Sequence, residues 1–251
     1  DWKVKTLFLA WQAPDLRHWF PVGRLDADPE HAKFIFQYTQ GALEAKERGF
    51  HPMPSFPQID KSYQSEELFP MFKNRVLGAQ RKDFGEYLRT LALEHNDPIE
   101  ILSITGGERQ TDSFEVFPKI NKLPDGSFHC RFFLHGLRHM SDPAQKRAMV
   151  LREGEELGVS IELTNPKTGL AIQLTSQDYE FVGWTPRYLV SDLLKSLADV
   201  SMIKATVVKV NPNEVPVNRR VLVEFQGHLP ASVEPMTDAA FQPIVAGSMK
   251  H

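Results

Sequence analysis

A polar, turn-rich stretch near the middle of the chain constrains the fold more than any other feature. Residues 121–127 read NKLPDGS, with an Asp-Gly pair at the centre and no apolar run. Such a stretch interrupts helices and strands, and a chain of 251 residues is long enough for two domains of ordinary size. We therefore expect domains at residues 1–120 and 128–230, a linker at 121–127 and a tail at 231–251. The alternative is a tight hairpin inside one domain.

The first 120 residues carry strand and helix signals in alternation. Segments rich in β-branched and aromatic residues, which favour strands, are residues 4–11, 22–25, 34–38 and 114–118. Helices are expected at four segments, residues 41–48, 65–77, 84–91 and 99–104. These segments have apolar residues at three- and four-residue spacing, or residues that typically start and end a helix. Three prolines within residues 50–57 exclude a helix and a central strand there. The pattern predicts a mixed β-sheet with helices.

The second half consists mainly of short strand patterns. Strands are expected at residues 128–137, 159–163, 170–174, 179–184, 203–210 and 220–225. Helices are expected at residues 144–151 and 187–197, and residues 165–169 form a hairpin loop. This order predicts a small β-barrel with one or two helices. The fold class of the whole chain is therefore α+β, with two domains.

Composition and charge narrow the classes of function. Residues 1–125 hold 16 basic and 19 acidic side chains and residues 126–251 hold 13 of each, so neither half is the strongly basic body that coats duplex DNA. Any contact with nucleic acid must be local. Cys130, the single cysteine, lies in an apolar run and is expected to be buried and inert. No apolar run approaches the roughly 18 residues that span a bilayer, so we expect a cytoplasmic protein without a membrane partner.

Several short motifs of the second half occur in a specific order. They are Gly136-Leu137-Arg138-His139, Arg152-Glu153-Gly154-Glu155-Glu156-Leu157, Asn165-Pro166, Ala171-Ile172, Val182-Gly183-Trp184 and Pro186-Arg187-Tyr188-Leu189. Together they resemble the HIRAN domain, a small β-barrel of DNA-repair helicases and isolated bacterial modules. The resemblance runs from about residue 128 to 225.

The HIRAN resemblance implies a pocket for the free end of single-stranded DNA. It places Arg138 against a phosphate and His139 where the family often has a stacking aromatic residue. The remaining implied contacts, through hydrogen bonds, stacking and charge, come from Asn165, Lys167, Trp184, Arg187 and Tyr188. An aromatic face binds any base, and a guanidinium grips phosphate without reading sequence. After Asn165-Pro166 the family usually has an aromatic and an acidic residue, whereas this chain has Lys167-Thr168. The acidic residue that could accept a hydrogen bond from the terminal hydroxyl of a strand is therefore absent at this place.

The first half carries a second ordered set of motifs. They are Val22-Gly23-Arg24-Leu25, the segment 34–38, Met53-Pro54-Ser55-Phe56-Pro57, Phe69 with Phe72-Lys73-Asn74, Pro98-Ile99-Glu100-Ile101-Leu102, Thr105-Gly106-Gly107-Glu108 and Phe114-Glu115-Val116-Phe117-Pro118. This set, over about residues 3–118, resembles the N-terminal subdomain of HipA-type toxin kinases. The kinase body does not follow it. The resemblance implies contact with a protein, since this subdomain packs on a kinase core in the family.

Other candidate residues have ordinary explanations beside the functional ones. His135 and His139 have a spacing that would suit a metal on a helix, but a strand is expected before Gly136. Asp26 and Asp28 suggest either a cation site or a solvated turn. Lys73, Arg75, Arg81 and Lys82 form either a solvated helix face or a ledge that binds phosphate.

The sequence thus predicts a bacterial nucleic-acid-binding protein that grips single-stranded or terminal DNA, with a first half that contacts a protein. The alternative is an antitoxin-like module that binds a HipA-type kinase and has no role with DNA. Nucleophile and metalloprotease motifs are absent from the sequence. We therefore expect no enzyme activity, no catalytic residue, no metal and no cofactor.

Overall fold

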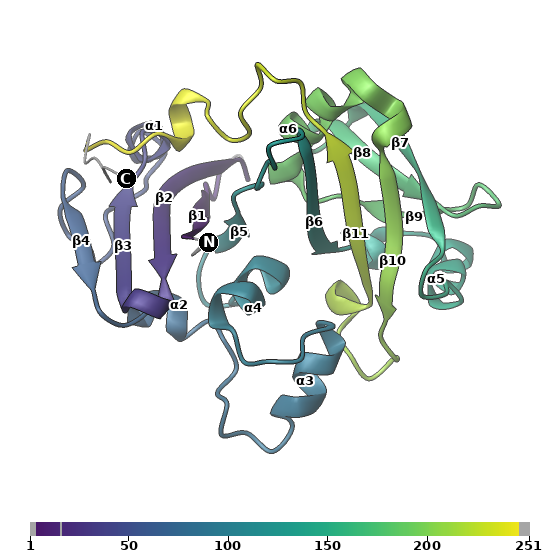
Figure 1. Ribbon diagram of the computed structural model, residues 1–251, viewed down its shortest axis with the longest axis horizontal. Helices are drawn as coiled ribbons and strands as arrows, with labels where there is room; N and C mark the ends of the chain where they lie inside the picture. The colour runs from purple at the N-terminus through teal and green to yellow at the C-terminus, as the bar shows by residue number, and fades with distance from the viewer. Residues whose placement is uncertain (1–3, 16, 246–251) are drawn as a thin grey trace. The chain divides into compact units, whose positions relative to one another are not determined.

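The chain folds into two units, each with its own antiparallel sheet (Figure 1). The computed structural model describes residues 4–15 and 17–245. Unit 1 comprises residues 1–81, 97–119 and 236–251, and unit 2 comprises residues 82–96 and 120–235. The α+β class is therefore as expected from the sequence. No helix within the described residues is long and apolar enough to cross a membrane.

Unit 1 is built on a five-stranded sheet in the order β4-β3-β2-β1-β5. Its strands are β1 (Lys5–Gln12), β2 (Trp19–Asp28), β3 (Lys33–Tyr38), β4 (Ser62–Ser65) and β5 (Phe114–Pro118). Its α-helices are α1 (Gly41–Lys46), α2 (Pro70–Lys73) and α4 (Pro98–Thr105). All pairings in this sheet are antiparallel. The predicted mixed sheet is wrong, because β1 to β4 follow one another as a meander and β5 returns antiparallel to β1.

Aromatic side chains fill the core of unit 1. The ring of Phe36 stacks on Phe56 at 4.1 Å between centroids, and both are fully buried. The proline-rich stretch at residues 50–57 forms neither helix nor strand, as predicted. It is held by the buried Tyr38, whose hydroxyl donates to Phe56 O at 2.6 Å and accepts from Met53 N at 2.8 Å. The proline-rich loop is therefore part of the core.

The predicted helix at residues 65–77 is wrong over most of its length. Residues 62–65 form β4, which pairs with residues 34–37 of β3. The helix α2 begins only at Pro70 and makes a single turn. Proline is favoured in the first turn of a helix and not in its interior. Pro70 therefore sets the start of the helix, and residues 66–69 before it are neither helix nor strand.

Unit 2 is built on a six-stranded sheet in the order β6-β11-β10-β7-β8-β9. Its strands are β6 (Ser127–Phe133), β7 (Glu156–Asn165), β8 (Gly169–Thr175), β9 (Phe181–Trp184), β10 (Lys204–Val210) and β11 (Val221–His228). Its α-helices are α3 (Phe84–Thr90), α5 (Asp142–Met149) and α6 (Val190–Lys195). The expected hairpin of β7 and β8 is confirmed. One bridge between His135 and Trp184 links the chain after β6 to β9, at the other edge of the sheet.

Short 3-10 turns extend the regular elements. They are η1 (Pro29–His31) and η6 (Ala239–Phe241) in unit 1, and η2 (Leu137–His139), η3 (Arg187–Leu189), η4 (Ser196–Met202) and η5 (Val217–Arg219) in unit 2. The helix expected at residues 187–197 is thus divided into η3, α6 and the start of η4. The strand expected at residues 128–137 stops at Phe133, and η2 follows it.

The predicted linker and tail both make specific contacts. Within residues 121–127, Leu123 N donates to Ser127 O, and the ammonium of Lys122 donates to Pro230 O at 2.9 Å within unit 2. Of the expected tail, residues 231–235 belong to unit 2 and the remainder to unit 1. There Phe241 packs edge-on against Phe8 at 5.0 Å. Residues 246–251 of that tail lie outside the described residues.

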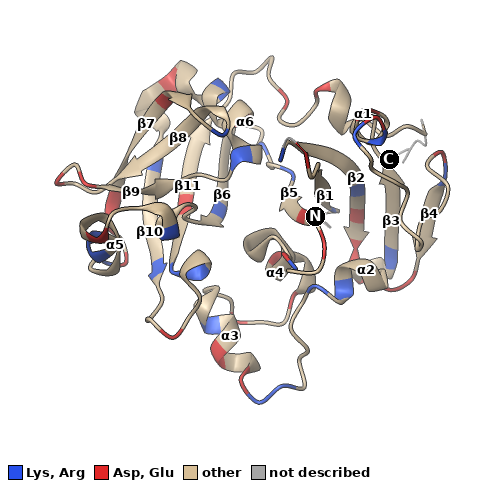
Figure 2. Cartoon of the chain, turned by 180° about the vertical axis from the view of Figure 1, so that it is seen from behind, with Lys and Arg blue, Asp and Glu red and all other residues tan. Residues whose placement is uncertain are grey.

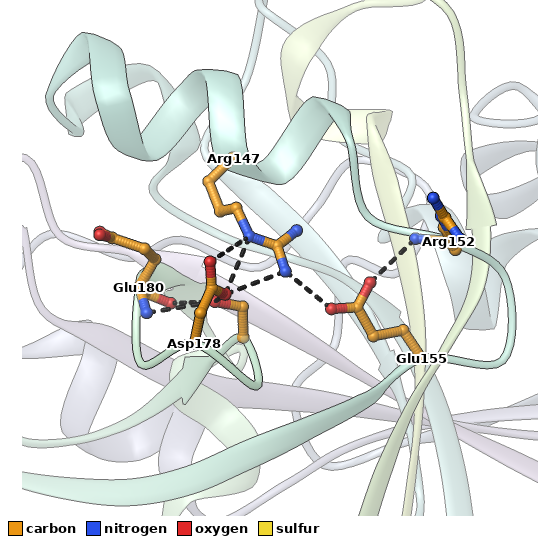
Figure 3. A network of polar contacts seen from close by, with 6 residues as sticks. Arg147, Arg152, Glu155, Asp178 and Glu180 are labelled. Carbon is orange, nitrogen blue, oxygen red and sulfur yellow. Dashed lines mark hydrogen bonds and ion pairs between the residues drawn. The ribbon is translucent and has the colours of Figure 1, made fainter.

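A polar network fixes α5 to the strands of unit 2 (Figure 3). Arg147 Nε donates to both carboxylate oxygens of Asp178, at 3.0 and 3.2 Å, and its Nη2 donates to Glu155 Oε1 at 2.9 Å. The other oxygen of Glu155 accepts from the backbone of Arg152. Desolvation alone would lower the pKa of Arg147, but the bonds to Glu155 and Asp178 raise it above its usual value. The helix is thereby tied to the turn before β9 and to the chain entering β7.

Candidate nucleic-acid interface

Trp184 is the centre of the candidate interface in unit 2. It ends β9, pairs with Gln173 of β8, and exchanges two backbone hydrogen bonds with His135 at 2.9 and 3.0 Å. Its ring lies against Gly136, where a Cβ atom would stand 2.2 Å from Trp184 Cε3. Gly136 also has a φ of +83°. Two separate features therefore require glycine at position 136: the backbone conformation and the close approach of the Trp184 ring.

Glu162 binds the indole of Trp184 and was not identified from the sequence. Its Oε2 accepts from Trp184 Nε1 at 2.9 Å, from Asn165 Nδ2 at 3.1 Å and from Gln173 Nε2 at 3.1 Å. The bonds from Trp184 and Asn165 hold the pKa of the Glu162 carboxyl below its ordinary value. Among the described residues no donor reaches Oε1. One oxygen of this carboxylate is thus fixed, while the other can still accept.

Arg138 and His139 lie together in the 3-10 turn η2, directly after Gly136. Arg138 Nε donates to His139 Nε2 at 3.1 Å. Both side chains are exposed. Within the described part of the chain no carboxylate lies at ion-pair distance from Arg138. Its charge can therefore meet an anion from solution.

Arg187 and Tyr188 begin the 3-10 turn η3 after β9. Arg187 is exposed and Tyr188 is half-buried. Burial, with the neighbouring positive charge of Arg187, lowers the pKa of His135 to about 4. His135 is therefore neutral at neutral pH, and it connects Arg187 to the residues around Trp184.

Asn165 and Lys167 lie in the loop between β7 and β8. Asn165 Oδ1 accepts from the backbone of Lys167 at 3.0 Å, and its amide donates to Glu162. The Lys167 side chain is exposed, and its ammonium makes no hydrogen bond or ion pair among the described residues. The bridge between His135 and Trp184 thus joins the segment that leads to Arg138 and His139 with the segment that leads to Arg187 and Tyr188. Asn165 shares Glu162 with Trp184, whereas Lys167 lies at the hairpin tip.

Several residues of the other candidate clusters have structural roles, whereas Lys73, Arg81 and Lys82 are exposed. Arg75 is almost fully buried and pairs with Asp112 at 2.5 Å, so it belongs neither to a solvated face nor to a phosphate ledge. Asp26 and Asp28 lie within β2 and are 8 % exposed. Asp26 accepts from Thr6 Oγ1 at 2.6 Å and Asp28 faces His31 Nδ1 at 2.9 Å, so the solvated-turn interpretation is wrong. No group of three His, Cys, Asp or Glu side chains suited to a metal occurs among the described residues.

Comparison with known proteins assigns no family. No family model matches the chain, and no curated protein sequence matches it. One solved structure, a protein from Lactobacillus plantarum, aligns with 41 % of this chain and all of its own at 16 % identity, with a TM-score of 0.30. A likeness at that level supports neither a fold assignment nor a function.

Proposed function

We propose that the protein binds single-stranded or terminal DNA through unit 2 and a protein partner through unit 1, without catalysis. The observation that carries the proposal is the backbone pairing of His135 with Trp184, since Arg138 follows three residues after the one and Arg187 three residues after the other. Stacking on an aromatic ring is worth about 1–3 kcal/mol per base and tolerates any sequence. The cations supply phosphate contacts beside it. The bridge between His135 and Trp184 would close the sheet into the small barrel of a HIRAN-like module.

Glu162 is the residue that would recognise a free strand end in this proposal. The acid that the HIRAN-like pattern lacks after Asn165-Pro166 has a counterpart three residues before Asn165. Its Oε2 is held by Trp184, Asn165 and Gln173, and its Oε1 is left to accept a hydrogen bond. A hydroxyl at a strand end is a donor, whereas an internal phosphodiester is not and would be repelled by the carboxylate. We therefore include a preference for free strand ends in the proposal.

A fluorescence anisotropy titration tests the proposal with a labelled single strand, a blunt duplex and a strand blocked at its 3′ end. We expect single-strand binding that weakens as salt rises and on blocking, and that is lost when Arg138→Ala and Arg187→Ala are combined. The matched control is Arg152→Ala, an exposed arginine whose side chain lies outside the set around Trp184. No binding at low salt would overturn the nucleic-acid proposal. Equal binding of free and blocked strands would remove the role of Glu162.

The second candidate function is a protein-interaction module that binds a HipA-type kinase. Apolar side chains on the β7–β8 hairpin favour it, since Leu163 is 72 % exposed and Ile161 and Leu170 are also exposed. All the motifs that resemble the HipA subdomain lie within unit 1. This alternative predicts a stable complex with a kinase core, and no effect of the two arginine substitutions on that complex. A pull-down with the purified kinase core of a HipA-type protein separates the two functions.

A further inference from the structure

Unit 2 contains a pocket that involves none of the seven predicted interface residues. It has a volume of about 280 Å³ and lies between α5, η2 and η5. Its apolar wall consists of Leu137, Ala148, Met149 and Val217, and its cationic residues are Lys146 and Arg220. Sites for drug-sized ligands usually have about 300–1,000 Å³. The pocket is slightly smaller than that range, so any ligand must be compact.

Arg220 is held by four contacts from its two terminal nitrogens, including one from Nη2 to Asn213 O at 3.4 Å, and one of the four is weak. Its Nη2 donates to Val215 O at 2.8 Å and its Nη1 to Asn213 Oδ1 at 3.0 Å. Nη1 also faces Met149 Sδ at 2.9 Å, and a thioether is a weak acceptor. Nε is buried without a hydrogen-bond partner. The guanidinium thus keeps a fixed position, and the thioether of Met149 is its weakest acceptor.

The charged residues that line the pocket are all positive. The lining contains no Asp or Glu. Among the described residues neither Arg220 nor Lys146 has an ion-pair partner. Two acidic residues after α5 form ion pairs elsewhere, Glu155 with Arg147 and Glu153 with Lys209. A partly buried cation without a counter-charge is stabilised by an anion. The positive charge favours an anionic group on the ligand, and the apolar wall favours an apolar body.

We propose that this pocket binds a small organic anion, with a phosphate or carboxylate group at Lys146 and Arg220 and a compact apolar body against Met149 and Val217. The charged group replaces the weak thioether contact with an oxygen acceptor. The apolar body removes the exposed pocket wall from water, which makes an aryl anion bind more tightly than the bare anion. This site is independent of the proposed binding of DNA.

Calorimetric titration of the full chain tests the proposal with phenyl phosphate, benzoate, phenol and inorganic phosphate. We expect saturable binding of phenyl phosphate, benzoate or both, about tenfold tighter than that of phenol and of inorganic phosphate. Whichever aryl anion binds more tightly identifies the charged group. Backbone amide resonances of α5 and of residues 213–220 are expected to shift on binding.

Two variants locate the site without disturbing Arg220, whose bonds hold residues 213–215. Lys146→Gln removes an exposed charge and is expected to weaken binding about threefold to tenfold. Val217→Trp fills the pocket and is expected to abolish binding. Lys82→Gln makes the same charge change at an exposed lysine outside the pocket and is expected to leave affinity unchanged. The proposal is overturned if neither aryl anion binds saturably, if phenol or inorganic phosphate binds as tightly, or if Lys146→Gln and Lys82→Gln behave alike.

Discussion

At the scale of single residues, Trp184 and Gly136 depend on each other. The ring of Trp184 occupies the space that a side chain at position 136 would need, and the turn at Gly136 leads directly to Arg138 and His139. The indole is also bound by Glu162. A change at position 136 should therefore act on the interface through Trp184, in addition to any strain in the backbone.

Comparison of Gly136→Ala with Gly154→Ala separates these two effects. Gly154 has a φ of +84°, nearly the same as Gly136, but a Cβ there would meet nothing within 4 Å. Gly154→Ala should cost about 1 kcal/mol, from strain alone. Gly136→Ala should cost about 1–3 kcal/mol more, because the ring must move. Urea unfolding measures the difference, and the ¹⁵N indole resonance of Trp184 reports the displacement. Equal destabilisation by the two variants would contradict a tight ring contact.

The sequence pointed to Trp184 and Asn165 as candidate residues but not to the contacts that hold them. Trp184, Asn165 and Arg138 belong to short motifs that a linear pattern can reveal. Glu162 lies 22 positions from Trp184 and reaches it across β8, so its role depends on the strand register. Asp26 and Asp28 were misjudged because β2 extends to Asp28 and the turn begins only at Pro29. Hydrogen-bond partners that lie far apart in the sequence are determined by how the strands pair in the folded chain.

At the scale of elements, local periodicity predicted strands better than helices. The period-two pattern of β7 and β8 located their hairpin, since alternation needs no knowledge of the partner. The apolar spacing at residues 65–77 fits a helix, yet residues 62–65 pair with β3 and Pro70 starts the helix late. Strand pairing accounts for Ser65 alone, and Pro70 accounts for the late start of the helix. Residues 82–96 joined unit 2 through contacts such as Asn211 Nδ2 with Thr90 O at 2.9 Å, which no local pattern reveals.

The attachment of α5 gives a prediction at this scale. Arg147→Met removes the bonds to Asp178 and Glu155, whereas Arg152→Met leaves the backbone bond from residue 152 to Glu155 in place. Arg147→Met should cost about 0.5–1.5 kcal/mol, since the pair with Asp178 is exposed and the one with Glu155 is less so. Denaturant midpoints measure the cost, and amide exchange in residues 176–180 should accelerate. Arg152→Met should have the same stability as the parent protein. A similar loss of stability in both variants would mean that the change in overall charge causes it.

At the scale of the whole molecule, charge is distributed without a dominant sign. Basic and acidic residues both occur on the strands and helices of unit 2 (Figure 2), and the chain as a whole has a net charge of −3. A protein that wraps nucleic acid through many phosphates needs a broad basic surface. The proposed interface instead has three cations, Arg138, Lys167 and Arg187. Binding by this molecule should therefore depend on salt weakly, and the dependence measures how many phosphates it contacts.

The slope of log affinity against log salt concentration gives the last prediction. Each phosphate contact on a single strand contributes about −0.7, so three contacts give a slope of about −2. Arg138→Ala should reduce the slope to about −1.4, since one counterion fewer is released, whereas Arg152→Ala should leave it unchanged. Anisotropy titrations at several salt concentrations measure both. A slope steeper than about −4 would require a basic surface beyond these residues. A slope of zero with retained affinity would mean that Trp184 holds the strand by stacking alone and that the arginines contact no phosphate.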